Sequence, residues 1–305
     1  MPFGIPQTET REFDFKKQCT FRQGASGIGV QVIRDSEIWY VDSGKANAVA
    51  GNGRTWNGAF LTIAAAIAAA GDDDIIYVAP GDYEISAALA VTQSGLTIIG
   101  PNRSCNDYKA LVYSDGAMNL MNIDANNVSI TGLGFSTVGG NGDCIVLSAT
   151  TVSYKCYIAH CRFDGYSKTG SGITCDTTND TPDLTVEHCL FRSFSAEAID
   201  SNATRAVYRH NMIWVTAGSV GIDFKQTAGN RPDNMAYGNM IIGSNSTDTG
   251  IKIASTEPTD GTLLIANNVV TNCNLNITQD KSDAGVVNNG TYGNGTAPFQ
   301  VDPNA

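Results

Sequence analysis

A pattern of residues that returns every 21 to 29 positions constrains the fold of this chain more than any other feature of its sequence. It begins near residue 128 and consists of alternating apolar residues, a two-residue turn, another apolar residue, a loop and a Gly-Ile or similar pair. Aligned on the second turn residue, the repeats give one column of positions: Leu133, Cys161, Cys189, Asn211, Asn239, Asn268 and Asn289. A recurring period of this length indicates a solenoid, in which each repeat stacks on the next.

Three apolar columns accompany this position and predict three short strands in each repeat. The first lies three residues before it: Ile130, Ile158, Val186, Tyr208, Ala236 and Ile265. The second lies two residues after it: Phe135, Phe163, Phe191, Ile213, Ile241 and Val270. The third follows after 10 to 12 residues: Ile145, Ile173, Ile199, Ile222 and Ile251. Because apolar residues alternate within each strand, the sequence predicts an all-β fold, a right-handed, single-stranded parallel β-helix with three short sheets.

The aligned turn column is expected to form a ladder that links the coils. An inward Asn at a tight turn hydrogen-bonds the backbone of the next coil and tolerates a left-handed backbone. Cys in the same column acts as a small buried apolar residue. The predicted structural ladder comprises six residues: Cys161, Cys189, Asn211, Asn239, Asn268 and Asn289. Most of the eight cysteines are therefore expected to be free thiols, which favours a reducing compartment.

The segments at the two ends of the repeats define the expected domain organisation. Residues 60–70 have the apolar spacing of a short helix, which would cap the first coil and cover its open strand edge. The acidic run at 72–74 is expected to be solvated, and residues 79–83 are expected to form a turn. We expect an extended amino-terminal arm over residues 1–37, the β-helix over 38–292 and a carboxyl-terminal tail over 293–305.

Composition excludes several classes of partner. The chain has 19 Lys and Arg against 30 Asp and Glu, a net charge of −11, so nucleic acid is not an expected partner. No stretch has the about 18 to 20 apolar residues of a membrane-spanning helix. The first thirty residues contain no apolar segment of a secretory signal, which favours assembly in the cytoplasm.

Four segments near the start of the repeats carry a resemblance to a known family. They are Trp39-Tyr40-Val41-Asp42-Ser43, Gly51-Asn52-Gly53, Ala59-Phe60-Leu61-Thr62-Ile63 and Ile76-Tyr77-Val78-Ala79-Pro80-Gly81-Asp82-Tyr83-Glu84. Together they resemble the opening of pectin-lyase-like right-handed β-helix proteins, and the likeness extends over about residues 38 to 292. This superfamily contains both polysaccharide-degrading enzymes and phage virion proteins, and the opening is most similar to the phage proteins.

This resemblance implies a non-enzymatic virion protein of a bacteriophage, a capsid decoration, head-fibre or spike subunit that assembles in the host cytoplasm. It further implies a homotrimer, which outward aromatic residues such as Tyr166, Trp214 and Tyr237 would support. Residues 1–37, with Phe13 and Phe15 alternating among charges, would attach it to the major capsid protein or another virion protein. No cofactor is expected.

A column of outward residues supports an alternative function, a tailspike-type depolymerase that acts on a host-surface polysaccharide as a glycosidase or lyase. The column carries Val146, Thr174, Asp200, Asp223, Lys252 and Asn276. Asp200 and Asp223 would lie on adjacent coils about 5 Å apart, a separation that suits a retaining glycosidase. The face resembles that of polygalacturonases, but segment 141–144 has one carboxylate where they have an Asp pair, and their Gly-His motif is absent. We therefore interpret Asp200, Asp223 and Lys252 as a polar ladder rather than as catalytic residues.

The three histidines of the chain all precede the turn column. His160, His188 and His210 are expected to stack at one corner of consecutive coils. Imidazoles are ligands for transition metals, but stacked rings point in parallel and do not converge on one ion. The sequence therefore favours a stacked row of histidines at the turn over a metal site.

Overall fold

The computed structural model describes residues 36–45, 51–102, 109–147, 154–166, 170–175, 182–216, 218–225, 233–244, 247–253, 263–273, 275–279, 285–287, 289–292 and 300–301. The chain divides into two compact units, Met1–Ser36 and Glu37–Ala305. Nearly all of the first unit, including the expected arm with Phe13 and Phe15, lies outside the described residues. The fold described here is that of the second unit.

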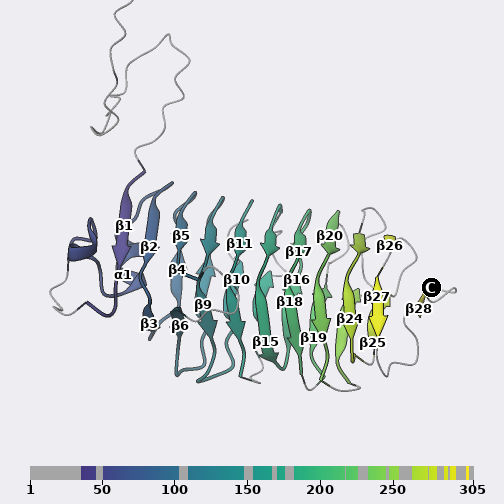
Figure 1. The fold of residues 1–305 in the computed structure, drawn as a ribbon. Coiled ribbons are helices and arrows are strands. Elements are labelled where there is room, and N and C mark those ends of the chain that lie inside the picture. Colours follow the sequence, from purple (N-terminus) through teal and green to yellow (C-terminus); the bar gives the residue numbers. More distant parts are fainter. Residues whose placement is uncertain are drawn as a thin grey trace, which may run out of the picture. The chain divides into compact units, whose positions relative to one another are not determined.

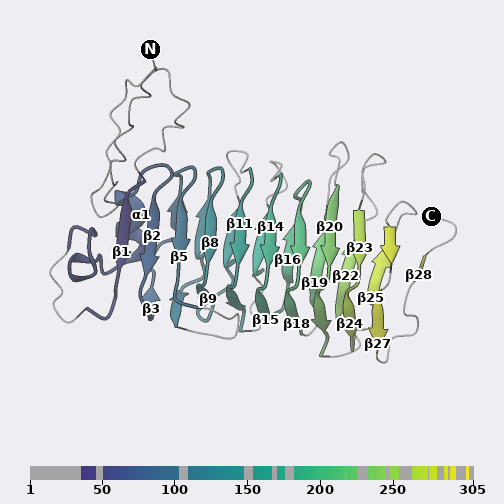
Figure 2. The same cartoon turned by 45° about the horizontal axis from the view of Figure 1, so that its top comes forward.

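The second unit is a stack of coils whose strands form three parallel sheets (Figures 1 and 2). The first sheet contains β1 (Ile38–Val41), β2 (Ile75–Val78), β5 (Thr97–Ile99), β8 (Ser129–Thr131), β11 (Tyr157–Ala159), β14 (Thr185–Glu187), β17 (Val207–Arg209), β20 (Asn234–Tyr237), β23 (Leu263–Ala266) and β26 (Gly285–Val287). The second contains β3 (Gly81–Glu84), β6 (Ala110–Tyr113), β9 (Gly134–Ser136), β12 (Arg162–Asp164), β15 (Leu190–Phe194), β18 (Met212–Val215), β21 (Met240–Ile242), β24 (Val269–Thr271) and β27 (Gly290–Tyr292). The third contains β4 (Leu89–Val91), β7 (Met121–Ile123), β10 (Ile145–Leu147), β13 (Ile173–Cys175), β16 (Glu197–Ser201), β19 (Val220–Phe224), β22 (Thr249–Ile253), β25 (Leu275–Gln279) and β28 (Gln300–Val301).

The core confirms the register that the sequence predicted. In the first sheet Ile130 pairs with Ile158, and Ile158 with Val186, and all three are fully buried. In the second sheet the rings of Phe135 and Phe163 stack with centroids 5.3 Å apart, and those of Phe163 and Phe191 are 4.6 Å apart. Each apolar column is thus a continuous stack along the inside of the coils, and most of its contacts join different coils.

An inward row of Asn side chains connects the carboxyl-terminal coils. The Oδ1 atom of Asn239 accepts hydrogen bonds from the backbone N–H of Asn211 at 3.0 Å and from its Nδ2 at 3.1 Å. Asn268 accepts the equivalent pair from Asn239, and Asn289 accepts it from Asn268. The row ends at Cys189, whose backbone N–H donates to Asn211 Oδ1 at 3.0 Å. Every coil turn in this row is therefore bonded to the next.

All six described cysteines are buried free thiols: Cys144, Cys156, Cys161, Cys175, Cys189 and Cys273. The Sγ atoms of Cys161 and Cys189 donate to backbone carbonyls of their own and neighbouring coils. Cys19 and Cys105 lie outside the described residues. Burial raises the pKa of Cys156 to about 11 and that of Cys175 to about 12.

The amino-terminal cap forms as expected, within narrower bounds. Helix α1 spans Ile63–Ala69 and is capped by Thr62, whose hydroxyl accepts a hydrogen bond from the backbone N–H of Ala65 at 3.2 Å. A short 3-10 helix, η1 (Trp56–Gly58), precedes it. In the part of the chain that the structure describes, no helix has the length and apolarity to cross a membrane.

Three local expectations differ from the structure. Asp74 is not solvated, because its carboxylate accepts hydrogen bonds from Trp39 Nε1 at 2.9 Å and from the backbone N–H of Gly71 at 2.7 Å. A turn expected at residues 79–83 is in part strand β3, since the chain there pairs with β6. The third sheet also extends beyond residue 292, because β28 pairs with β25 inside the segment expected to be a tail.

Candidate functional site

The outward column of the third sheet brings the acidic candidates together. Asp200 on β16 pairs with Asp223 on β19, and Asp223 pairs with Lys252 on β22. Lys252 then pairs with Thr278 rather than with the expected Asn276. A shift of two residues keeps the same face of the strand, so the sequence located the face correctly but not the residue that follows Lys252 in the column.

Lys225, which directly follows β19, binds this column and was not among the candidates from the sequence. Its Nζ lies 2.8 Å from Asp200 Oδ2, 3.0 Å from Glu197 Oε1 and 3.9 Å from Asp223 Oδ2. Lys252 Nζ approaches Asp223 Oδ2 from the next coil at 3.0 Å. Three carboxylates and two ammonium groups thus form one cluster across three coils, here called the acidic cluster: Glu197, Asp200, Asp223, Lys225 and Lys252.

The two aspartates are buried more deeply than the lysines. The side chain of Asp223 is 0% exposed and that of Asp200 16%, against 33% for Lys225 and 44% for Lys252. Asp200 Oδ1 and Asp223 Oδ1 are buried and have no hydrogen-bond partner among the described residues. Burial raises the pKa of both carboxyl groups, against the lowering effect of the neighbouring lysines. The aspartates therefore hold protons at higher pH than exposed aspartates do.

Lys225 keeps its charge within the acidic cluster. Burial alone would lower its pKa, but its hydrogen bonds to Asp200 and Glu197 raise the pKa above the usual value for lysine. A charged ammonium beside two carboxyl groups of raised pKa can support proton transfer and can stabilise a developing negative charge. The cluster thus places protonatable and charged groups side by side on one face of the third sheet.

The three histidines form an exposed stack at a corner of the coils. The rings of His160 and His188 have centroids 5.2 Å apart at 3°, and those of His188 and His210 are 5.3 Å apart at 17°. All three residues have a left-handed backbone, with φ of 54°, 53° and 54°. Within the described residues, no group of three or more His, Cys, Asp or Glu side chains is arranged to hold a metal ion.

The aromatic residues expected at a trimer contact differ in their surroundings. Tyr166 is 55% exposed and Trp214 37% exposed, and the guanidinium of Arg192 lies 4.4 Å from the ring centroid of Trp214. Tyr237 instead accepts a hydrogen bond from Arg209 at 3.0 Å and contacts His210 edge to face. The homotrimer itself stays a prediction.

The architecture defines the class of the chain, which is a right-handed parallel β-helix protein. No protein-family model matches the sequence, and no curated protein matches it. Similar solved structures include a pectin methylesterase of Aspergillus niger, with a TM-score of 0.57 and 13% identity over 86% of this chain and 87% of that one. Pectin methylesterases of Erwinia chrysanthemi and of the rice weevil give TM-scores of 0.55 and 0.51, at 13% and 14% identity. They cover 85% and 82% of this chain and 90% of their own chains.

At such identities the likeness shows the fold alone. It confirms the expected relation to pectin-lyase-like β-helix proteins at the level of architecture. These neighbours are polysaccharide-acting enzymes by name, and none of them is a virion protein. The association with phage virions is therefore not shown by the comparisons.

Proposed function

We propose that this chain acts on a polysaccharide as a hydrolase, with the acidic cluster as its active site and Asp200 as the acid–base group. The observation that carries the proposal is the pair of Asp200, partly buried, and Asp223, fully buried, on adjacent coils, in which each carboxyl has a buried oxygen without a partner among the described residues. This reverses the first interpretation of the sequence and takes up its alternative.

Energetics favour a functional reason for this cluster over a structural one. Removing charges from water costs several kcal/mol per ion, which their mutual attraction offsets only in part. A fully buried carboxylate such as Asp223 is therefore a poor source of stability. Carboxyl groups whose pKa is shifted by burial and by charged neighbours concentrate at catalytic sites. Two such groups on adjacent coils can also divide into one that holds a proton and one that does not.

The exposures assign the roles. Asp200, the more exposed of the two aspartates, is the group that contacts substrate. Asp223 lies beneath the lysines and is a positioning residue that sets the proton affinity of Asp200. Lys225 and Lys252 present partly exposed ammonium groups beside the reacting bond, where they would bind an anionic substituent or a developing oxyanion.

The names of the fold neighbours support a polysaccharide as substrate. These neighbours are pectin methylesterases. One of the structures, similar to this chain with a TM-score of 0.54, contains a bound hexasaccharide. A flat sheet face along a stack of coils suits a long substrate that lies across several coils. The bond attacked is an ester or a glycosidic bond, since both are cleaved by general acid–base catalysis.

Substrate panels with three separate readouts test this proposal. The purified full chain is incubated with methyl-esterified polyuronate, unesterified polyuronate and neutral polysaccharides. Methanol release reports ester hydrolysis, new reducing ends report glycosidic hydrolysis, and the ultraviolet absorbance of unsaturated products reports a lyase. Asp200→Asn is expected to lower the rate about 100-fold or more. Asp223→Asn is expected to move the pH profile of the remaining activity.

Asp82→Asn is the matched control, since Asp82 is an exposed carboxylate on β3. It is expected to change neither the rate nor the pH profile. The proposal is refuted if no substrate gives methanol or new reducing ends, if cleavage gives unsaturated products, which show elimination, or if Asp200→Asn is fully active.

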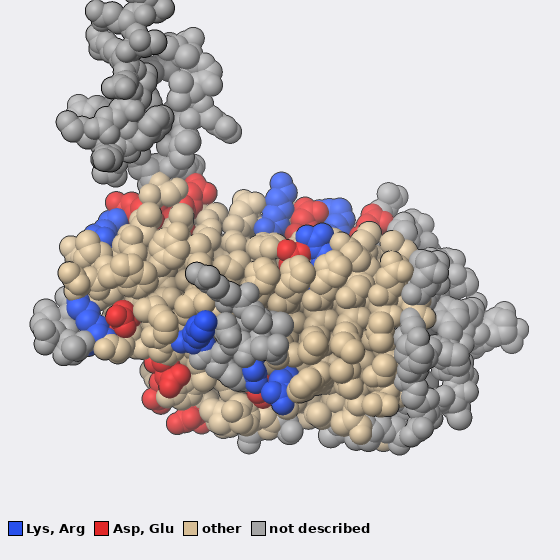
Figure 3. Space-filling model, in the orientation of Figure 1, with Lys and Arg blue, Asp and Glu red and all other residues tan. Residues whose placement is uncertain are grey.

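A second candidate is the non-enzymatic virion subunit, a homotrimer that contacts a capsid or other virion protein through residues 1–37. An exposed apolar stripe on the second sheet favours it, in which Met240 and Val269 pair at 41% and 37% exposure. Trp214, 37% exposed, lies on the preceding strand, β18. The view in Figure 3 also shows a broad surface over the carboxyl-terminal coils without charged side chains. Recovery of the chain in purified particles, without any sugar cleavage, would favour this candidate.

A further inference from the structure

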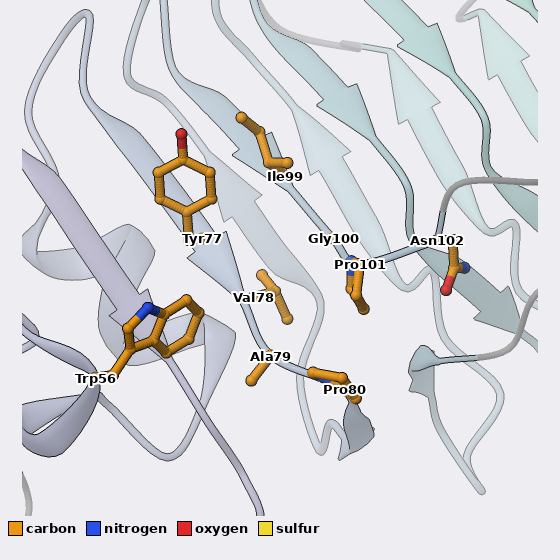
Figure 4. Close-up of a pocket in the computed structure, with 9 residues that line it drawn as sticks. All are labelled: Trp56, Tyr77, Val78, Ala79, Pro80, Ile99, Gly100, Pro101 and Asn102. Carbon is orange, nitrogen blue, oxygen red and sulfur yellow. The ribbon is translucent and has the colours of Figure 1, made fainter.

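An open groove lies on the outer side of the first sheet at its amino-terminal end (Figure 4). Its volume is about 620 Å³, within the usual range for sites that bind small molecules. The lining comes from η1, from β2 and β5, and from the segments that follow these two strands: Trp56, Tyr77, Val78, Ala79, Pro80, Ile99, Gly100, Pro101 and Asn102. The groove is separate from the acidic cluster, which lies on the third sheet around β16, β19 and β22.

Aromatic rings form one wall of this groove. Trp56 is 48% exposed and stands beside Tyr40, with ring centroids 4.7 Å apart. Tyr40 in turn stacks on Tyr77 at 6.0 Å and 23°. Figure 4 shows Trp56 and Tyr77 toward one end of the groove, Pro80 and Pro101 farther along it and Asn102 at the opposite end. Covering this exposed indole with a flat apolar surface removes apolar area from water, which favours binding.

The charge of the groove restricts its occupant. None of its nine lining residues carries a full charge, whereas the chain as a whole has a net charge of −11. An acidic ligand would meet the repulsion of the chain without a cation in the groove to offset it. A neutral pyranose ring is complementary, because its axial C–H groups form a flat apolar face while its hydroxyls remain at the open side. The hydroxyl of Tyr77 is the polar group that would orient it, whereas Asn102 is 5% exposed and its Oδ1 accepts the backbone N–H of Lys109 at 2.9 Å.

We propose that this groove binds a neutral sugar ring of a polysaccharide, with the indole of Trp56 as its stacking surface. The site holds the glycan and performs no chemistry. It does not depend on the activity proposed for the acidic cluster, because no residue is shared between the two.

Affinity electrophoresis of the full chain tests this site. Native gels contain soluble neutral β-glucan, neutral galactomannan or polygalacturonate, and the retardation at rising polysaccharide concentration gives an apparent Kd. We expect retardation in at least one neutral gel. Any retardation in polygalacturonate is expected at the lysines of the acidic cluster and is therefore not changed by replacement of Trp56. Trp56→Ala is expected to weaken binding at least tenfold, whereas Trp56→Phe, which keeps an aromatic face, retains most of it.

Trp214→Ala is the matched control, because Trp214 is comparably exposed but lies on β18 of the second sheet. It is expected to bind like the unaltered chain. The gels report binding and not bond cleavage, so failure of this site and failure of the active-site proposal are distinguishable. The proposal is overturned if no neutral polysaccharide retards the chain, if Trp56→Ala binds as well as the unaltered chain, or if only polygalacturonate is bound.

Discussion

Replacement of Asn239 by Ala tests how far the Asn row holds the coils together. The side chain is 1% exposed and makes four hydrogen bonds. Its Oδ1 accepts from the backbone N–H and Nδ2 of Asn211 at 3.0 and 3.1 Å. Its Nδ2 donates to the carbonyl of Tyr208 and to Asn268 Oδ1, both at 2.9 Å. Alanine removes all four and leaves their partners buried.

Each such bond contributes about 1 kcal/mol net, so Asn239→Ala is expected to cost about 4 kcal/mol of unfolding free energy. Asn289, at the end of the row, gives an internal comparison. Its side chain accepts two bonds from Asn268 and donates one to the carbonyl of Ile265, but it is only partly buried. Water replaces part of what Asn289→Ala removes, and we expect a cost of about 1–2 kcal/mol.

Urea unfolding followed by circular dichroism measures both variants against the unaltered chain. Asn239→Cys, the residue that this column has in two earlier coils, is expected to fall between alanine and asparagine, because a thiol donates but accepts poorly. An Asn239→Ala variant within about 1 kcal/mol of the unaltered chain would refute the ladder as a source of stability. Equal costs at Asn239 and Asn289 would refute the argument from burial.

Three other predictions follow from burial and backbone geometry. Because burial raises the folded-state pKa of Asp223 above its unfolded value, stability from this group is greatest below about pH 4 and falls as pH rises through the folded pKa. Urea midpoints from pH 4 to 7 should therefore decline less in Asp223→Asn, and an unchanged slope would contradict the shift. Cys156 and Cys175 should resist iodoacetamide at pH 8 in the folded chain and react after unfolding, as peptide mass spectrometry would show; labelling of the native chain would contradict their burial. At His188, where φ is 53°, Val should cost about 1–2 kcal/mol by thermal melting and Gly little, and equal melting temperatures would exclude backbone strain.

The core was predictable because a solenoid presents the same positions to its interior in every coil. Ile130, Ile158 and Val186 are equivalent by period alone, and the structure pairs them as predicted. Three parallel sheets follow from three such columns. The Asn column required one more inference, that an amide at a left-handed turn bonds the next coil.

The acidic cluster was only partly predictable. The aligned column located Asp200, Asp223 and Lys252, but Lys225 and Glu197 lie outside that column and were missed. Their contacts join residues 25 and 28 positions apart, and the position of the lysine depends on how the chain leaves β19. A cationic residue directly after a strand with an outward aspartate, as Lys225 is after β19, would have been a usable signal for an ion pair with that column. The groove at Trp56 gave no such signal, because its exposed indole belongs to the short 3-10 helix η1, which lies outside the repeat.

The His stack and the acidic cluster together show what distinguishes a site on a β-helix. Coils lie about 4.8 Å apart, so any residue type that recurs at one position forms a row without further cause. The turn occupied by the histidines requires a left-handed backbone, which Gly132 and Gly238 supply in other coils, with φ of 69° and 65°. Alignment of three exposed imidazoles is therefore no sign of a ligand. The acidic cluster differs, because it combines opposite charges, burial and oxygen atoms without partners, features that the period of the coils does not produce. On this scaffold we expect chemistry where outward residues of different charge meet on neighbouring coils, rather than where one residue type recurs from coil to coil.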